Sequence, residues 1–238
     1  MDGAALLARL ASEPAKAAIL LDVDGVLAPI VDVPADASVP EETREELRRL
    51  HARYPLVACV SGRPGPDAAR VVGVEELVYV GEHGLELEPR AREWRGRLHE
   101  IAATVDWDDV ETKPLTVTFH YRRAADEAEA VRFLEAVAAR ARDEGLVARF
   151  GRKVLELRPP IAAHKGTAVL HLLGDRRLER ALYAGDDTTD LDAFEALAGL
   201  ELGVRVAVAS AEGPPELRGA ADLVVDGPAA FLSVLRAP

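Results

Sequence analysis

The sequence predicts an α/β fold, a doubly wound parallel sheet interrupted by an inserted α+β segment. Short apolar runs of strand length recur, and each ends in a small or polar cluster before a helical segment. This alternation of strands and helices stops near residue 89 and resumes near residue 161. With 238 residues, the chain can form one large domain or two modest ones.

The first strand of the predicted sheet covers Ala17 to Leu21, after a short amphipathic helix over residues 3 to 12. Its apolar run is typical of a strand that is buried on both faces. Asp22 and Asp24 follow at the carboxyl end of the strand, where open α/β sheets bind their ligands. Two carboxylates that leave one buried strand together repel each other unless a cation or a proton lies between them.

Two further helix-strand units repeat this pattern. They pair the expected helices Pro40–His51 and Asp67–Val72 with the strands Leu56–Val60 and Leu77–Val80. The strand Leu56–Val60 runs into Ser61-Gly62-Arg63, and the strand Leu77–Val80 runs into Gly81-Glu82-His83-Gly84. Polar clusters therefore follow three consecutive strands.

Residues 89 to 160 have the character of an inserted α+β domain. Leu115 to Tyr121 alternates apolar and polar residues, and Asp126 to Asp143 has the periodicity of a long helix, with Gly145 as its stop. A hairpin is expected from residue 147 to 157, across Gly151-Arg152. We expect residues 1–88 and 161–238 to form one discontinuous core and residues 89–160 to form a separate domain.

After the inserted segment, the alternation of β-strands and α-helices resumes. A helix over Lys165 to Leu173 precedes a strand over Ala181 to Ala184, which ends in Gly185-Asp186-Asp187-Thr188-Thr189-Asp190. The remaining elements are expected at residues 191–198 (helix), 204–208 and 223–225 (strands) and 228–235 (helix). In a parallel sheet, the polar clusters of the chain converge on one edge.

The side chains in these clusters are complementary for phosphoryl transfer. Carboxylates from two strands can hold Mg²⁺, which also keeps waters and phosphate oxygens as ligands. A lysine and a hydroxyl can bind the other phosphoryl oxygens, and a carboxylate can attack phosphorus to form an aspartyl phosphate. The sequence contains no P-loop pattern, so a nucleotide-type phosphate cradle is not expected.

Composition excludes several classes of partner. A net charge of −12 repels nucleic acid and anionic membranes, and no apolar run reaches the length of a membrane span. The single cysteine, Cys59, lies in an apolar run and permits no intramolecular disulfide. We expect a cytoplasmic protein that binds neither nucleic acid nor membrane.

Four features, taken in order, resemble the four motifs of the haloacid dehalogenase (HAD) superfamily: Asp22-Val23-Asp24-Gly25, Ser61, Lys165, and Gly185-Asp186-Asp187 with Asp190. The insert between Ser61 and Lys165 is similar to the C2B-type cap of that superfamily. Within that superfamily the chain resembles the trehalose-6-phosphate phosphatase family over essentially its whole length. The matching pieces are Ser61-Gly62-Arg63, Gly81-Glu82-His83-Gly84, Glu111-Thr112-Lys113, His120-Tyr121-Arg122, Lys153 to Pro159, His164-Lys165-Gly166, and Gly185 to Asp190 with Ala193-Phe194.

This resemblance implies a Mg²⁺-dependent hydrolysis of trehalose 6-phosphate through an aspartyl phosphate. Asp22 would be the nucleophile and Asp24 the general acid and then base, while Ser61 and Lys165 would neutralise the phosphoryl group. The metal would lie on Asp22, the Asp24 carbonyl and Asp186, with Asp187 and Asp190 nearby. The side chains expected at the sugar are Arg63, Glu82, His83, Lys113, Arg122, Glu156 and Arg158. A monomer is expected, with a trehalose-phosphate synthase of the same pathway as a partner.

Other functions remain open at this stage. The substrate could be another sugar phosphate, such as sucrose phosphate or a glucosyl-glycerate phosphate, or the chain could be a non-catalytic sensor of a sugar phosphate. Glu156 and Arg158 could form a plain cross-strand pair, and His83 could be a turn residue. Val26 and Leu191 depart from the family pattern, which usually has threonine and often has glutamate at these positions.

Overall fold

The computed structural model describes residues 3–31, 33–151, 153–210 and 213–237. They form two compact units, one made of the segments up to Gly84 and from Ala163 onward, the other of Leu85–Ala162. Each unit has its own sheet and its own hydrophobic core. Among the described residues, no helix is both long enough and apolar enough to cross a membrane.

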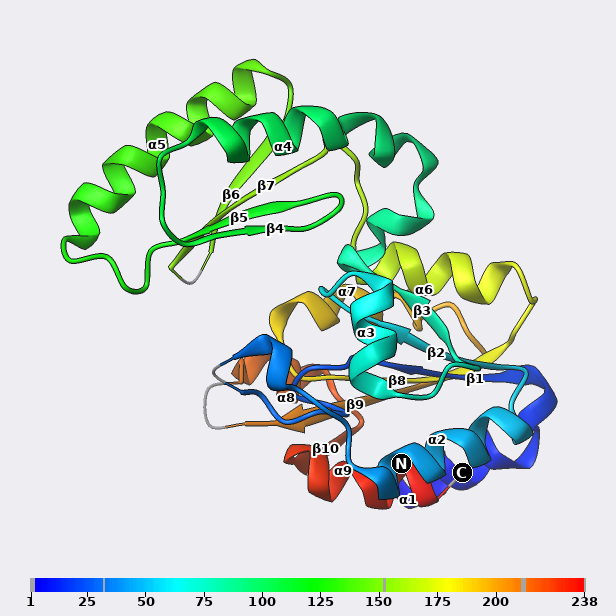
Figure 1. The fold of residues 1–238 in the computed structure, drawn as a ribbon. Helices are drawn as coiled ribbons and strands as arrows, with labels where there is room; N and C mark the ends of the chain where they lie inside the picture. Colours follow the sequence, from blue (N-terminus) through cyan, green and yellow to red (C-terminus); the bar gives the residue numbers. More distant parts are fainter. Residues whose placement is uncertain (1–2, 32, 152, 211–212, 238) are drawn as a thin grey trace. The chain divides into compact units, whose positions relative to one another are not determined.

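A six-stranded parallel sheet forms the centre of the first unit, in the order β10-β9-β8-β1-β2-β3 (Figure 1). The strands are β1 (Ala17–Leu21), β2 (Leu56–Val60), β3 (Val78–Val80), β8 (Arg180–Gly185), β9 (Leu202–Ala209) and β10 (Leu223–Asp226). The strand order reverses between β1 and β8, which pair in register from Ala17 and Arg180 to Leu21 and Ala184. In open α/β sheets, the crevice at such a switch point is the usual ligand site.

Helices cover both faces of this sheet (Figure 1). They are α1 (Gly3–Ser12), α2 (Glu41–Arg53), α3 (Gly65–Val72), α6 (Lys165–Gly174), α7 (Leu191–Ala196), α8 (Pro215–Ala220) and α9 (Gly227–Arg236). Helices α1, α2, α3 and α9 share one buried apolar cluster with the sheet, to which α2 contributes Leu47 and Leu50. Helices α6 and α7 pack against each other. The predicted doubly wound parallel sheet is confirmed.

The differences from the predicted core elements are local. Helix α3 begins at Gly65 rather than Asp67, because the neighbouring prolines favour an early helix start. Helix α7 ends at Ala196, two residues before the expected end. Helix α8 was not predicted, because it buries only Leu217 and therefore has no apolar periodicity.

The second unit contains a four-stranded antiparallel sheet in the order β4-β5-β7-β6. Its elements are α4 (Arg95–Thr104), β4 (Val110–Thr112), β5 (Val117–His120), α5 (Glu127–Asp143), β6 (Val147–Gly151) and β7 (Val154–Arg158). Leu155 and Leu157 of β7 join residues of both helices in one core. Because side chains alternate along a strand, Glu156 and Arg158 lie on the opposite face of this sheet.

The inserted α+β segment is therefore confirmed, with two elements that were not predicted. Helix α4 buries only Leu98 and Ile101, and β4 is short and largely exposed, so neither has a strong local signal. Helix α5 begins after Asp126, whose side chain accepts a hydrogen bond from the backbone N–H of Glu129 (3.0 Å). Arg152, in the predicted hairpin turn, lies outside the described residues.

Short 3₁₀ segments complete the described chain. They cover Pro14–Lys16, Pro34–Asp36, Glu82–Leu87, Pro89–Trp94 and Thr188–Asp190. The segment at Glu82–Leu87 contains backbone angles that do not belong to a helix, and these lie in the loop that follows β3.

Candidate active site

Asp22 lies directly beyond β1, at the point where β1 and β8 separate. Its backbone N–H still donates to the carbonyl of Ala184 (2.9 Å), which extends the β1–β8 pairing by one residue. The side chain is buried, and its Oδ1 accepts from the N–H of Val23 (2.7 Å). The strand pairing therefore holds this carboxylate at the switch point of the sheet.

Lys165 is the first residue of α6 and lies 143 positions from Asp22 in the chain. Its Nζ donates to Asp22 Oδ2 (2.6 Å) and to Asp190 Oδ1 (2.7 Å), and all three side chains are buried. Burial alone would lower the pKa of Lys165, but the carboxylates of Asp190 and Asp22 outweigh it and raise this pKa. The lysine is therefore a fixed cation beside Asp22.

Asp190 is completely buried, and both of its carboxylate oxygens accept two hydrogen bonds. Oδ1 accepts from Lys165 and from the hydroxyl of Tyr183 (both 2.7 Å), and Oδ2 accepts from the backbone N–H groups of Asp186 and Asp187 (both 3.0 Å). An ionised carboxylate offers about four lone-pair positions, so these donors occupy Asp190 fully. Its geometry favours a positioning role over metal ligation.

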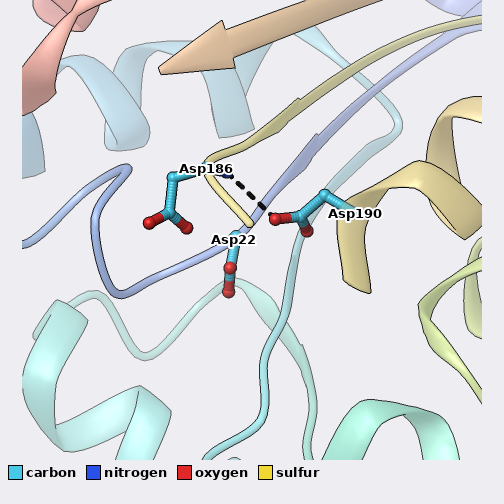
Figure 2. Close-up of side chains that lie close together, drawn as sticks. All are labelled: Asp22, Asp186 and Asp190. Carbon is cyan, nitrogen blue, oxygen red and sulfur yellow. Dashed lines mark hydrogen bonds between the residues drawn. The ribbon is translucent and has the colours of Figure 1, made fainter. Parts of the chain in front are cut away.

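Asp186 follows β8 and lies beside Asp22 (Figure 2). Carboxylate oxygens of Asp22, Asp186 and Asp190 lie within 4.8 Å of one another. Burial, reinforced by the Asp22 and Asp190 charges, raises the pKa of Asp186 to about 8. Burial likewise raises the pKa of Asp22 to about 7, although the Lys165 ammonium opposes this shift. A cation at this position would relieve the repulsion, so the residues present fit a hard divalent ion with oxygen ligands.

Two glycines make this arrangement possible. Gly25 has a φ of +77°, and a Cβ there would lie 2.2 Å from Asp186 Oδ2. At Gly185, a Cβ would lie 2.2 Å from the Asp190 carboxyl carbon. A side chain at either position would displace one of the two carboxylates, so both glycines are needed at this site.

Asp24 points its carboxylate at Arg63 rather than at Asp22. Arg63 Nε and Nη2 donate to the two Asp24 oxygens (2.7 and 2.8 Å), and Nη1 donates to Asp67 (2.8 Å) and to the carbonyl of Pro34 (3.0 Å). This bidentate pair fixes both position and orientation. Because its donors are directed at these three groups, the geometry favours Arg63 as a residue that positions Asp24.

The loops after β2 and β3 are joined through Ser61. The buried Ser61 accepts from Arg63 N–H at its Oγ (3.1 Å) and from His83 N–H at its carbonyl (2.9 Å). Glu82 and His83 both have positive φ angles (48° and 55°), which non-glycine residues rarely adopt. The N–H groups of Glu82 and His83 donate to the carbonyls of Arg63 and Ser61 (both 2.9 Å), and these hydrogen bonds hold the turn in its strained conformation.

The other predicted residues are described here within their own units. Asp187 is exposed at the edge of the loop after β8. In the inserted unit, Glu156 and Arg158 share one face of the sheet, Lys113 lies in the β4–β5 connection beside Glu111 (3.5 Å), and the exposed Arg122 lies in the loop after β5. The structure brings Asp22, Lys165, Asp186 and Asp190 together.

The sequence analysis did not single out Tyr183, whose hydroxyl donates to Asp190 within this cluster. Its only local signal is a polar aromatic residue inside an aliphatic strand, two positions before Gly185. Val26, which departs from the family pattern, is fully buried within the apolar cluster of the core.

Comparison with known proteins identifies relatives of this chain. A family model described as trehalose-phosphatase matches residues 20–109 and 98–229. A trehalose-phosphate phosphatase of Mycobacterium avium is 35% identical over 203 residues, covering 76% of this chain and 51% of that protein. A protein of Mycobacterium tuberculosis described as an uncharacterised glycosyl hydrolase is 36% identical over 217 residues, covering 79% of this chain and 16% of that protein.

Among solved structures, a trehalose-6-phosphate phosphatase of Aspergillus fumigatus superimposes with a TM-score of 0.69. The two are 24% identical, and the match covers 99% of this chain and 96% of the other. This likeness supports the fold. The chain spans about half, or less, of the length of the two mycobacterial relatives.

Proposed function

The chain belongs to the trehalose-phosphatase family, and we propose that it releases trehalose and phosphate from trehalose 6-phosphate with Mg²⁺ as cofactor. The observation that carries this proposal is the buried Asp22, whose carboxylate is held between the Lys165 ammonium and the Asp186 carboxyl. A nucleophilic carboxylate, a fixed cation and oxygen ligands for a metal are what a phosphoryl transfer of this kind requires.

In the proposed reaction, an oxygen of Asp22 attacks phosphorus and the bond from phosphorus to the sugar oxygen breaks. The leaving oxygen takes a proton from the Asp24 carboxyl, and an aspartyl phosphate remains on Asp22. Water, deprotonated by Asp24, then attacks phosphorus and releases phosphate and free Asp22. An acid or base in this position contributes about 10²–10⁴-fold.

Mg²⁺ would be held by the carboxylates of Asp22 and Asp186 and by the backbone carbonyl of Asp24. When bound, it would neutralise charge on the phosphate oxygens and orient the phosphate for attack. Asp190, occupied by four donors, would keep Lys165 and the loop after β8 in place. The exposed Asp187 would lie outside the immediate ligand set.

Arg63 acts in this proposal on the acid rather than on the sugar. Both Asp24 oxygens accept hydrogen bonds from Arg63. One of these oxygens must therefore turn away from Arg63 before Asp24 can carry the proton for the leaving group. The same pair aligns the carboxylate that later activates water. Ser61, held by its neighbours in the β2 loop, contributes its hydroxyl to the phosphoryl group.

Recognition of the sugar is assigned to the second unit and to the loop after β3. In this proposal residues 1–88 and 161–238 carry the chemistry, and residues 89–160 select the substrate. The side chains proposed to contact the disaccharide are Glu82, His83, Lys113, Arg122, Glu156 and Arg158. Glu156 and Arg158 share one face of the antiparallel sheet, and a carboxylate and a cation together can serve several sugar hydroxyls.

The proposal extends to the cellular setting. We propose a monomeric, cytoplasmic enzyme that binds neither nucleic acid nor membrane and uses the product of a trehalose-phosphate synthase. The net charge of −12 supports the absence of a nucleic-acid or anionic-membrane partner. The lone Cys59 is buried, and burial together with the Asp22 charge raises its pKa, so it supplies no reactive thiol.

Phosphate release should be measured with trehalose 6-phosphate, sucrose 6-phosphate, glucosyl-glycerate phosphate and glucose 6-phosphate, with and without Mg²⁺. We expect trehalose 6-phosphate to be preferred and activity to require the ion. Equal rates on glucose 6-phosphate would overturn the specificity. Asp22→Asn should abolish turnover, while the control Asp36→Asn, at an exposed carboxylate, should not.

A further inference from the structure

Tyr183 connects the central strand β8 to the catalytic lysine. The side chain is completely buried, and its ring meets Phe194 of α7 edge to face, with centroids 6.1 Å apart. Its hydroxyl lies 2.7 Å from Asp190 Oδ1, the oxygen that also accepts from Lys165. Two hydrogen bonds that share one acceptor atom therefore link the Tyr183 hydroxyl to the ammonium beside Asp22.

The direction of this hydrogen bond follows from chemistry. Burial raises the pKa of Tyr183, and the neighbouring Asp190 and Asp22 charges raise it further, so the hydroxyl keeps its proton. A protonated hydroxyl beside a carboxylate donates to it. Tyr183 therefore supplies one of the donors that determine the rotation of the Asp190 carboxylate, while the backbone supplies two others.

The orientation of the Lys165 ammonium depends on that carboxylate. An ammonium has three N–H donors, and within the described chain Asp22 and Asp190 accept two of them. Once these two acceptors are fixed, the direction of the third N–H is fixed as well. If Asp190 were free to rotate, the third donor would lose its direction.

We propose that Tyr183 is a positioning residue that acts through Asp190 to aim the Lys165 ammonium at the transferring phosphoryl group. This inference rests on the proposed phosphatase function for its catalytic part. Its structural part, the fixing of the ammonium by the tyrosine hydroxyl, is independent of any substrate.

The test variant is Tyr183→Phe, which removes the hydroxyl and keeps the ring against Phe194. Its matched control is Tyr79→Phe. Tyr79 lies in β3, and its hydroxyl donates to the carbonyl of Val74 (2.5 Å), so this variant also loses a hydrogen bond from a tyrosine. A general loss of stability would affect both variants, whereas a positioning role concerns Tyr183 alone.

The first measurement is an NMR spectrum of the protein labelled with ¹⁵N-lysine. The chain has four lysines, Lys16, Lys113, Lys153 and Lys165, and only Lys165 is buried with two carboxylate partners. We expect a slowly exchanging Lys165 ammonium signal. Tyr183→Phe should speed the exchange of the Lys165 ammonium protons with water about tenfold or more, because it removes a strong hydrogen bond to the charged Asp190 carboxylate. Tyr79→Phe should leave this exchange rate unchanged.

The second measurement is steady-state kinetics with vanadate as a transition-state mimic. Tyr183→Phe should lower kcat about tenfold, leave KM within about twofold and weaken vanadate inhibition about as much as it lowers kcat, because the aimed donor acts in the transition state. Loss of the ring packing alone would not produce this split between kcat and KM.

The outcomes separate the two proposals. Unchanged Lys165 exchange in Tyr183→Phe overturns the positioning role, whatever the enzyme hydrolyses. The same holds if both tyrosine variants lose kcat and vanadate inhibition equally. If Lys165 exchange responds as expected but the unmodified protein hydrolyses no sugar phosphate, the proposed function fails and the fixing of the ammonium stands.

Discussion

The raised pKa of Asp186 predicts that this protein releases protons when it binds Mg²⁺. Burial and two neighbouring carboxylates raise that pKa to about 8, from an ordinary value of 3.8. Below about pH 8, the cation-free protein therefore keeps a proton on Asp186. A divalent ion must displace this proton before the carboxylate can act as a ligand, so its apparent affinity should increase with pH.

The magnitude follows from proton linkage. While the pH is below the Asp186 pKa, one proton leaves per bound ion, so the association constant should rise about tenfold per pH unit. Below about pH 7, where Asp22 is protonated as well, the increase should approach about a hundredfold per unit. Above pH 8 the affinity should level off.

The same shift affects stability. The folded protein holds the Asp186 proton between pH 3.8 and about 8, whereas the unfolded chain does not. The free energy of unfolding of the cation-free protein should therefore fall by about 1.4 kcal/mol per pH unit across this window because of this one carboxyl. Mg²⁺ should offset the loss, so its effect on Tm should grow from pH 6 to pH 8.5.

Isothermal titration calorimetry in two buffers of different ionisation heat would count the released protons at pH 6.5, 7.5 and 8.5. Asp186→Asn should weaken Mg²⁺ binding at least about tenfold and remove the pH dependence above pH 7. Asp187→Asn is the matched control, because it removes an adjacent but exposed carboxylate. No proton release at pH 6.5, or equal losses in the two variants, would refute the reasoning.

Three further predictions concern other parts of the site. Arg63→Lys should lower kcat about tenfold with little change in KM, because lysine cannot make the bidentate pair with Asp24; a matching rise in KM would instead indicate substrate binding. Val26→Thr should lower the free energy of unfolding by about 1–3 kcal/mol in chemical denaturation without raising kcat, since it buries a hydroxyl in an apolar cluster. A higher kcat would show that this position faces the phosphate. Glu156→Gln should raise KM for trehalose 6-phosphate more than for glucose 6-phosphate. Equal changes in the two KM values would show that Glu156 has no part in sugar recognition.

The strands of the core were predictable because their signals are local. Apolar runs such as Ala17–Leu21 are buried on both faces and end at polar clusters, and a parallel sheet is the structure that such runs build. The inserted sheet was predictable in part, through the alternation in β5 and the hairpin of β6 and β7. Helix α4 and strand β4 have few buried residues, so periodicity carries no information about them.

The sequence by itself determined which acids, and which lysine, stand at the edge of the sheet. Strand ends converge once the sheet is parallel, so the proximity of Asp22 and Asp186 follows from chain order and register. Only the tertiary structure decided what each polar group faces. Arg63 donates to Asp24, and Asp190 is occupied by Tyr183, Lys165 and two backbone N–H groups. These pairings depend on the directions of side chains that are far apart in the chain, and no local pattern encodes such directions.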